Sequence, residues 1–463
     1  MRLRLVVAAS ATCLAVLAPA LQGSLPSTAT TAAVAAKPSA TSSATSSVTS
    51  SPKVLDGTLV EVHAQPRLGS RTPEGAPEQW LRTADGKAYQ LDFTAASELK
   101  AHTSVQVTGT VSGNKVAVVS AVPSASTASA AAGTSAAPST SSTYSTSGTT
   151  RTGVRSVLIM MVDWTKPDAT TPAAAKAQIG VTTNNWYRAV SSNKLGFSAT
   201  ATPWMTLAKQ DCSLTNGAYW KVLAAAENAA VAHGYNPKAY DHEMVYFPFD
   251  ANCNYGGLGS VSDRSSWVNG EMDSRVANHE LGHNLGLNHA RSAVCVDSTN
   301  HEVTASSTCT TDEYGDLFDT MGVPPSGTPQ ISAIQMNHLG WLTGHFTTTT
   351  STSSVTLSPL ESGTGTRADR ILVGGSEYWL EYRQPVGVDA TLKTYTGATD
   401  GVLIHRVAAD GGTDLLDATP DAFKSFADAA LPVGRTWTSP EKVSVKVTSI
   451  SSARAVVSIT MPK

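Results

Sequence analysis

Residues 279–289, HELGHNLGLNH, have the residue types and spacing of a catalytic metal site. In a helix, His279 and His283 are four residues apart and lie on one face, so both imidazoles can reach one metal ion. We expect Gly286 to end this helix in a left-handed conformation, after which the chain turns back and His289 supplies a third nitrogen. Three histidines leave one position of a tetrahedral Zn2+ site open, as in catalytic zinc sites.

Glu280, next to the first histidine, gives this site a general base. Zinc held by three neutral imidazoles lowers the pKa of its bound water and polarises a substrate carbonyl. Glu280 can then take the proton of the water and pass it to the leaving amine, which predicts hydrolysis of peptide bonds. Two alternatives stay open: a zinc amidase or deacetylase that acts on cell-wall or glycan amides, and a non-catalytic secreted adhesion protein with a structural metal.

The N-terminal segment predicts a secreted protein, and the charge gives no sign of a nucleic-acid partner. The 463 residues carry a net charge of -3 without a long run of Lys or Arg, so nothing indicates binding to nucleic acid. Residues 1–23 contain Arg2, Arg4, an apolar run and small residues, as a Sec-type signal peptide does. No later stretch has the uninterrupted apolar length of a membrane span. We expect an extracellular monomer that is not attached to a membrane after signal removal.

Four cysteines remain once the signal peptide is removed, namely Cys212, Cys253, Cys295 and Cys309. An even number suits an oxidising compartment. Of the three pairings, we favour Cys212 with Cys253 and Cys295 with Cys309, because the second pair closes a short loop directly after the third histidine. A second zinc site made of these cysteines is the alternative, although no C-x-x-C spacing supports it.

The N-terminal third of the chain alternates between low-complexity and β-like segments. Residues 24–52 and 123–153 are rich in Ser, Thr and Ala, which predicts a spacer and a flexible linker. Residues 53–122 contain five short β-like runs with hairpin signals at Asp85-Gly86 and Gly113-Asn114. They predict a small β-barrel of the OB type. It is either a pro-domain that is removed or a retained accessory module, and it has no cysteine that could cover the zinc with a thiolate.

Residues 154–345 are expected to form the catalytic domain. Apolar runs predict buried strands at residues 156–162 and 244–249. Helical periodicity predicts helices at residues 173–191, 216–233 and 271–285. Residues 256–261, GGLGSV, precede the zinc helix. They predict either a bulged loop or a sheet edge on which a substrate peptide adds itself as a strand.

Residues 346–463 contain Thr/Ser-rich turns between short β-like runs, which predict a C-terminal β-sandwich. This domain either binds matrix or glycan or only braces the catalytic domain. We expect His405, flanked by Ile404 and Arg406, to be structural rather than a metal ligand.

The H-E-x-x-H-x-x-G-x-x-H pattern resembles that of the metzincin zinc peptidases, in which a methionine-bearing turn follows downstream. Residues 313–322, EYGDLFDTMG, supply such a turn, and their Tyr-Gly-Asp and Asp-Thr-Met-Gly elements resemble the gametolysin family, peptidase family M11. Asn185-Trp186-Tyr187 and residues 338–342, HLGWL, are also similar to that family. The resemblance covers roughly residues 154–345, with a weaker similarity at residues 378–383.

This resemblance implies an α+β fold, in which a metzincin-type catalytic domain with a twisted sheet and a zinc helix lies between the β-barrel and the β-sandwich. It implies a zinc metalloendopeptidase that acts on protein or glycoprotein substrates. Its residues would be three zinc ligands, a general base and a hydrophobic floor, namely His279, His283, His289, Glu280 and Met321.

Three further residues of the methionine turn have less certain roles. Asp316 and Asp319 either orient a ligand imidazole or cap turns, and we favour caps. Val323 stands where part of the metzincin clan has a tyrosine. Any second group that stabilises the tetrahedral intermediate must therefore come from elsewhere.

Overall fold

The computed structural model describes residues 51–67, 77–93, 103–124, 151–408, 411–420 and 426–463. All of them belong to one compact unit, Ser50–Lys463. The expected signal peptide and most of both Ser/Thr-rich segments lie outside the described residues. Among the described residues, no helix has the length and apolar character needed to cross a membrane.

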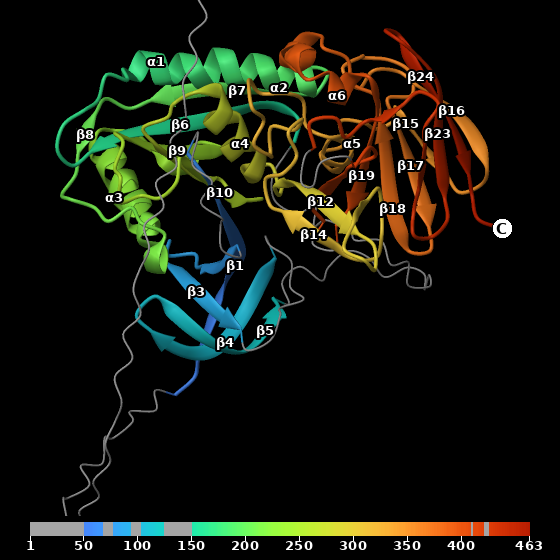
Figure 1. The fold of residues 1–463 in the computed structure, drawn as a ribbon. Helices are drawn as coiled ribbons and strands as arrows, with labels where there is room; N and C mark the ends of the chain where they lie inside the picture. Colours follow the sequence, from blue (N-terminus) through green and yellow to red (C-terminus); the bar gives the residue numbers. More distant parts are fainter. Residues whose placement is uncertain (1–50, 68–76, 94–102, 125–150, 409–410, 421–425) are drawn as a thin grey trace, which may run out of the picture. The chain divides into compact units, whose positions relative to one another are not determined.

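Five strands follow one another in the N-terminal part, drawn in blue to cyan in Figure 1: β1 (Lys53–Gln65), β2 (Glu78–Arg82), β3 (Ala88–Phe93), β4 (Ser104–Ser112) and β5 (Lys115–Pro123). Strand β1 pairs with β2, β2 with β3, β3 in parallel with β5, β5 with β4, and β4 again with β1. The ring of pairings is therefore closed. Its interior is an apolar cluster that includes Leu59, Leu81, Val107 and Val116.

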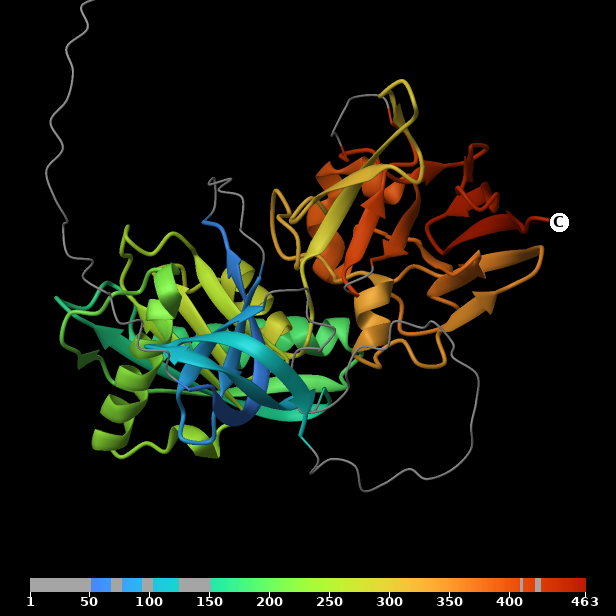
Figure 2. The same ribbon diagram turned by 90° about the horizontal axis from the view of Figure 1, so that it is seen from below.

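Strand β1 is longer than the ring requires. Residues 53–62 pair within the ring, and Glu61–Gln65 pair antiparallel with β10 (Gly257–Val261) of the following domain. Both groups of strands thus form one 11-stranded sheet. From β10 it continues through β11 (Ser265–Asn269), β9 (His242–Phe247), β6 (Gly153–Asp163) and β7 (Leu195–Ala201), so that the main path is β2-β3-β5-β4-β1-β10-β11-β9-β6-β7, and β8 (Met205–Thr206) pairs with β6 beside this path. Figures 1 and 2 both show β1 extending from the ring to the edge of the second group.

The second half of this sheet is mainly parallel. Its strands are β6 (Gly153–Asp163), β7 (Leu195–Ala201), β8 (Met205–Thr206), β9 (His242–Phe247), β10 and β11 (Ser265–Asn269). Strands β7, β6, β9 and β11 are parallel neighbours, whereas β10 runs antiparallel to β11. The continuous apolar run in β6 is buried because both faces of a parallel sheet are covered.

The helices of this region largely follow the predicted ranges. The helix predicted at 173–191 comprises α1 (Pro172–Ala177), a π-helical segment (Gln178–Thr183) and α2 (Asn184–Val190). The helix predicted at 216–233 is α3 (Ala218–Ala232). Its predicted start at Asn216 was too early, because Asn216 and Gly217 have φ angles of 52° and 62° and cannot continue a right-handed helix.

The C-terminal part contains two sheets. One has the order β13-β12-β20-β19-β18-β17-β15 with β14 and β21 attached, and the other has the order β16-β24-β23-β22. Side chains of both sheets share one apolar cluster, which includes Ile371, Leu380, Val445 and Val457. The elements are β12 (Ala290–Val296), β13 (Glu302–Val303), β14 (Cys309–Asp312), α5 (Ala333–His338), β15 (Phe346–Thr349), β16 (Ser353–Leu357), β17 (Ala368–Val373), β18 (Ser376–Glu381), a 3-10 segment (Gly387–Thr394), α6 (Thr396–Thr399), β19 (Gly401–Val407), β20 (Thr413–Leu416), β21 (Leu431–Pro432), β22 (Thr436–Thr438), β23 (Ser444–Ser451) and β24 (Arg454–Thr460).

The first C-terminal sheet crosses the domain boundary that was expected at residue 345. Strand β12 directly follows His289, and it pairs in parallel with β20, over one hundred residues later in the chain. The segment after the third histidine is therefore held by the C-terminal part of the protein.

Both disulfides have the pairing that the sequence favoured. Cys212 is bonded to Cys253, and Cys295 on β12 is bonded to Cys309 on β14. The second bridge joins two residues that are already directly opposite in the sheet. It closes a loop between strands that begin immediately after the histidine motif.

Candidate metal site

Helix α4 (Ser274–Asn284) carries the first two histidines of the motif. The predicted start at Glu271 was wrong by three residues. Asp273 is the N-cap, since its backbone is extended and its carboxylate accepts a hydrogen bond of 3.0 Å from the Val276 amide. This cap fixes where the helix begins and therefore which face presents the histidines.

The other end of α4 confirms the expected role of Gly286. Its φ angle is +98°, and its amide donates to the His283 carbonyl at 2.7 Å. The Leu287 amide donates to the Gly282 carbonyl at 3.0 Å. These two bonds form a Schellman motif, which satisfies the last carbonyls of the helix and reverses the chain.

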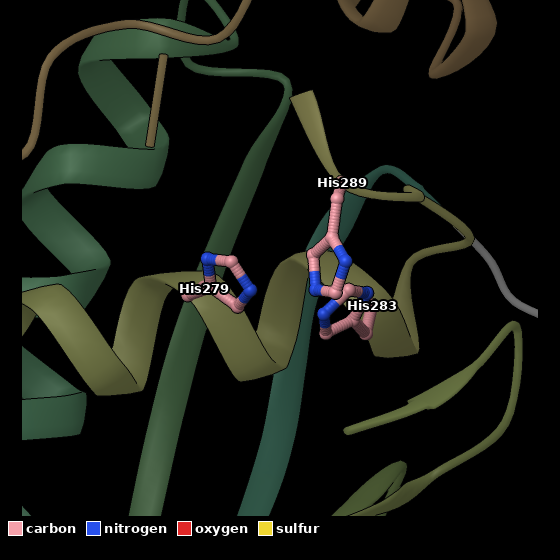
Figure 3. Close-up of side chains that lie close together, drawn as sticks. All are labelled: His279, His283 and His289. Atoms are coloured by element: carbon pink, nitrogen blue, oxygen red, sulfur yellow. The ribbon is translucent and has the colours of Figure 1, made fainter. Parts of the chain in front are cut away.

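The reversal brings His289 against the two helical histidines. Figure 3 shows His279 and His283 on successive turns of α4 and His289 pointing toward them from the following segment. The ring centroids are 4.7 Å apart for His279 and His283, 5.2 Å for His279 and His289, and 4.8 Å for His283 and His289. One nitrogen of each ring lies within 4.8 Å of the others, so the three could hold one metal ion.

Hydrogen bonds orient all three rings in the same manner. Nδ1–H of His279 donates to the Thr320 carbonyl at 2.9 Å, and Nδ1–H of His283 donates to the Leu287 carbonyl at 2.8 Å. The Nδ1 atom of His289 lies 3.0 Å from Oε1 of Glu313. Each bond fixes the tautomer in which Nε2 has a lone pair for a metal.

Burial keeps these rings neutral. Desolvation lowers the pKa of His279 to about 3 and holds the pKa values of His283 and His289 well below the ordinary value for histidine. A neutral imidazole is the form that binds metal. The Nε2 atoms of His279 and His283 are buried and have no hydrogen-bond partner among the described residues, which is a costly state that a bound cation would relieve.

Glu280 is completely buried between α4 and β10. A Cβ atom at Gly257 would lie 2.2 Å from Oε1 of Glu280, and one at Gly259 would lie 2.8 Å from Oε2. Gly257 and Gly259 therefore let strand β10 pass close to the helix. They belong to a regular strand that pairs with β1 on one side and β11 on the other, so the interpretation of residues 256–261 as a bulged loop was wrong.

The methionine turn lies beneath the helix. A Cβ atom at Gly282 would lie 2.5 Å from Sδ of Met321, so the thioether packs directly on the helix backbone. The carboxylate of Asp319 accepts from the amides of Met321 and Ser332, each at 2.7 Å, and Asp316 accepts from the Phe318 amide at 2.8 Å. Both aspartates are thus turn caps, as we favoured from the sequence.

Buried charges connect this turn to the C-terminal sheets. Nε2 of His405 lies 2.9 Å from Oδ2 of Asp316, which supports the structural role expected for that histidine. The Arg383 guanidinium donates to the carbonyls of Phe318 and Gln330 at 3.2 and 3.0 Å. It also forms an ion pair of 2.6 Å with Asp389. Strand β19 and the segment that follows β18 therefore help to position the methionine turn.

Three residues near the histidines were not predicted as site residues. Glu313 hydrogen-bonds to His289, and the Tyr314 ring packs on His289 with centroids 4.0 Å apart. His63, on β1, stacks on His283 at a centroid distance of 5.0 Å, and its Nδ1 lies 3.4 Å from Nδ1 of His289. Glu313 and Tyr314 belong to residues 313–322, the methionine turn that was recognised in the sequence. No local sequence pattern marked His63 as a site residue.

Comparisons with known proteins identify one family. The family model for gametolysin peptidase M11 matches residues 171–414, which is more than half of the chain. No curated protein sequence matches the chain significantly.

Similarity to solved structures is low. A structure of a chaperone-substrate complex aligns with 45% of this chain and 32% of its own length, at 13% identity and a TM-score of 0.22. Two crystal structures of OgpA from Akkermansia muciniphila, one of the wild type and one of an inactive form with an O-glycopeptide substrate, align with 61% of this chain and 96% of their own, at 11% identity and TM-scores of 0.24 and 0.23. Scores at this level support no conclusion about this chain.

Proposed function

Because the chain belongs to the gametolysin family of peptidases, peptidase family M11, we propose that it is a zinc-dependent endopeptidase that cleaves extracellular proteins or glycoproteins. The observation that carries this proposal is the convergence of His279, His283 and His289 on one point, each with its Nδ1 engaged elsewhere. Three nitrogen donors suit Zn2+ and leave a coordination position open for chemistry.

The residues around this point have separate tasks in hydrolysis. A zinc ion held there would supply Lewis-acid activation of water and of the substrate carbonyl. Glu280 would take the proton of the attacking water and deliver it to the leaving amine, and its dry environment would strengthen that proton transfer. Met321 would support the helix from below as a packing residue, because a thioether is a poor ligand for zinc.

Tyr314 is our candidate for the second group that stabilises the tetrahedral intermediate. Its ring lies on His289, and its hydroxyl donates a hydrogen bond to the carbonyl of Ala64, a backbone oxygen of the strand that lies beside the metal site. A hydroxyl that reaches a peptide carbonyl at this place is positioned to donate to the oxygen that becomes negative in the transition state. Tyr314 would thus replace the tyrosine that is absent at Val323.

We also propose that the protein is secreted and that a small β-barrel and a β-sandwich flank its catalytic part. The N-terminal signal pattern and the two disulfides support secretion. The closed ring β1–β5 has the pairing expected of a small OB-type barrel, and the two C-terminal sheets with their shared apolar cluster support a sandwich.

Replacing Glu280 with alanine tests the mechanism. We expect the processed E280A protein to lose casein hydrolysis, by at least about 1,000-fold, while it keeps one equivalent of zinc. Glu377→Ala, which removes a carboxylate of β18 that pairs with Arg370, is the matched control and should retain activity. Casein cleavage that survives E280A would refute the assigned base. Release of acetate or of cell-wall amines without casein cleavage would favour the amidase or deacetylase.

A further inference from the structure

The edge of β10 beside the metal histidines, called the groove below, is occupied by the chain itself. Residues Glu61–Gln65 of β1 pair antiparallel with β10, with His63 opposite Gly259 and Gln65 opposite Gly257. These are the two glycines whose missing side chains bring β10 close to Glu280 and His283. An extended peptide is therefore already present at the sheet edge next to the proposed catalytic groups.

Contacts on the metal side hold this strand in place. The His63 ring stacks on His283 and meets His289 edge-on at 4.6 Å, while its Nε2 lies 2.9 Å from Glu61. The Tyr314 hydroxyl donates to the Ala64 carbonyl, and the Gly256 amide donates to the Gln65 carbonyl at 2.8 Å. Backbone pairing and side-chain packing thus act on the same short segment.

Ion pairing fixes the end of the segment at the start of α4. Arg67 forms an ion pair of 2.7 Å with Glu271 and lies over the Phe249 ring at 3.8 Å. The Pro66 carbonyl accepts a hydrogen bond of 3.4 Å from Arg275. Residues 61–67 therefore contact the groove along their whole length.

The opposite face of β1 anchors it in the domain core. Val60, Val62 and Ala64 belong to the same apolar cluster as Leu258 and Trp267. Since β1 is also a strand of the N-terminal ring, the segment cannot leave the groove without moving that ring.

The three histidines and Glu280 are closed off from solvent. His279, His283 and Glu280 are 0% exposed and His289 is 1% exposed. A second peptide would need the β10 edge and the space of His63, both of which are taken. A substrate peptide that binds as an added strand at this edge would exclude β1.

We propose that residues Glu61–Arg67 are an intramolecular inhibitor, which keeps the enzyme latent until the N-terminal ring is released by cleavage between the ring and Gly153. The inference rests on the proposed peptidase function. Latency here needs no thiolate, since the chain has no cysteine between Cys13 and Cys212. The added strand, with His63 packed on the metal histidines, blocks the site instead of a thiolate.

The expected degree of latency follows from tethering. A tethered strand at an effective concentration of about 1 mM, with an intrinsic Kd of about 10 μM for its groove, leaves about 1% of molecules open. The intact chain should therefore cleave substrate about 100-fold more slowly than the opened enzyme.

The first experiment follows the strand without catalysis. A recognition sequence for a site-specific protease is placed within residues 125–150 of the full chain, in an E280A background that cannot process itself. After cleavage and dilution, we expect amide exchange in residues 256–261 to rise while exchange in β9 stays slow. Unchanged exchange in residues 256–261 after the ring has separated, as seen by size-exclusion chromatography, would overturn the proposal.

The second experiment measures hydrolysis of quenched fluorescent casein by the same chain with Glu280 intact. We expect the uncut chain to show about 1% of the cut activity at every concentration, because its inhibitor is tethered. After cutting, inhibition should depend on protein concentration and vanish on dilution. Full activity of the uncut chain would overturn the inhibitor. Mass spectrometry that finds cleavage within residues 61–67 would also overturn it, because the segment would then be a substrate.

Variants provide a test that does not require release. His63 and Arg67 lie beyond Val62, the last β1 residue paired with β2, so H63A/R67A should leave the ring folded. This double variant should raise activity of the uncut chain by about tenfold, while K87A in an exposed hairpin of the ring should not change it. An absence of casein cleavage in all forms, together with the expected exchange in residues 256–261, would refute the peptidase proposal and leave the strand displacement intact.

Discussion

Replacing Gly257 with alanine tests whether β10 must lack a side chain where it passes helix α4. A Cβ atom at this position would lie 2.2 Å from Oε1 of Glu280 and 2.7 Å from Cγ1 of Val276. Since ordinary van der Waals contact begins at 3.4 Å, the carboxylate must move by about 1 Å.

Such a displacement should affect catalysis much more than folding. Misplacing a reacting group by about 1 Å costs about 100-fold in rate. The carboxylate is the end of a flexible side chain and can turn away, so the folding cost should be about 1 kcal/mol, at the low end for overpacked sites. We expect kcat of the processed G257A enzyme to fall about 100-fold while its zinc content is unchanged.

Gly180→Ala is the matched control. A Cβ atom at Gly180 meets only Ala199 at 3.6 Å, which is ordinary contact, so this variant should keep its activity. Casein hydrolysis, zinc analysis and thermal unfolding are measured on both variants. Activity of G257A equal to that of G180A would refute the argument that the glycine is required for the position of Glu280.

Four further predictions concern the metal, Tyr314 and two buried groups. A chelator should abolish hydrolysis and lower Tm, and added zinc should restore both, because a metal that binds only the folded state stabilises it. The Y314F variant should lose about 100-fold in kcat of the processed enzyme with KM and zinc content unchanged, as is typical when one donor to the oxyanion is removed; a change in KM alone would contradict this role. Burial lowers the pKa of His242 to about 4, so the unfolded state binds more protons below pH 6.5, and about 3 kcal/mol of stability should be lost as the pH falls from 6.5 through 4. Urea unfolding of wild type and H242N at both pH values checks this, since the variant should lack that part of the loss. R383A leaves buried carboxylates unpaired and should cost about 3–5 kcal/mol, whereas R370A, whose ion pair is partly exposed, should cost below about 1 kcal/mol in the same denaturation assay.

The convergence of the three candidate metal ligands could be predicted from the sequence because their geometry is local. The spacing of His279 and His283 is set by the helix period, and Gly286 sets the reversal that returns His289. The first strand of the catalytic sheet was likewise marked by its apolar run, and the favoured disulfide pairs were those that the structure contains. The starts of α4 and α3 were misplaced, because the Asp273 cap and the left-handed backbone at Asn216 and Gly217 were not recognised.

The surroundings of the site were decided by tertiary structure. His63 and His289 are 226 positions apart in sequence, and only the pairing of β1 with β10 brings them together. In the same way, the pairing of β12 with β20 joins the segment after the third histidine to the C-terminal sheet. Periodicity reports which face of a strand is buried, but it does not report which distant strand will be its neighbour. For this reason the sequence determined which three histidines converge, whereas the fold decided what lies over them.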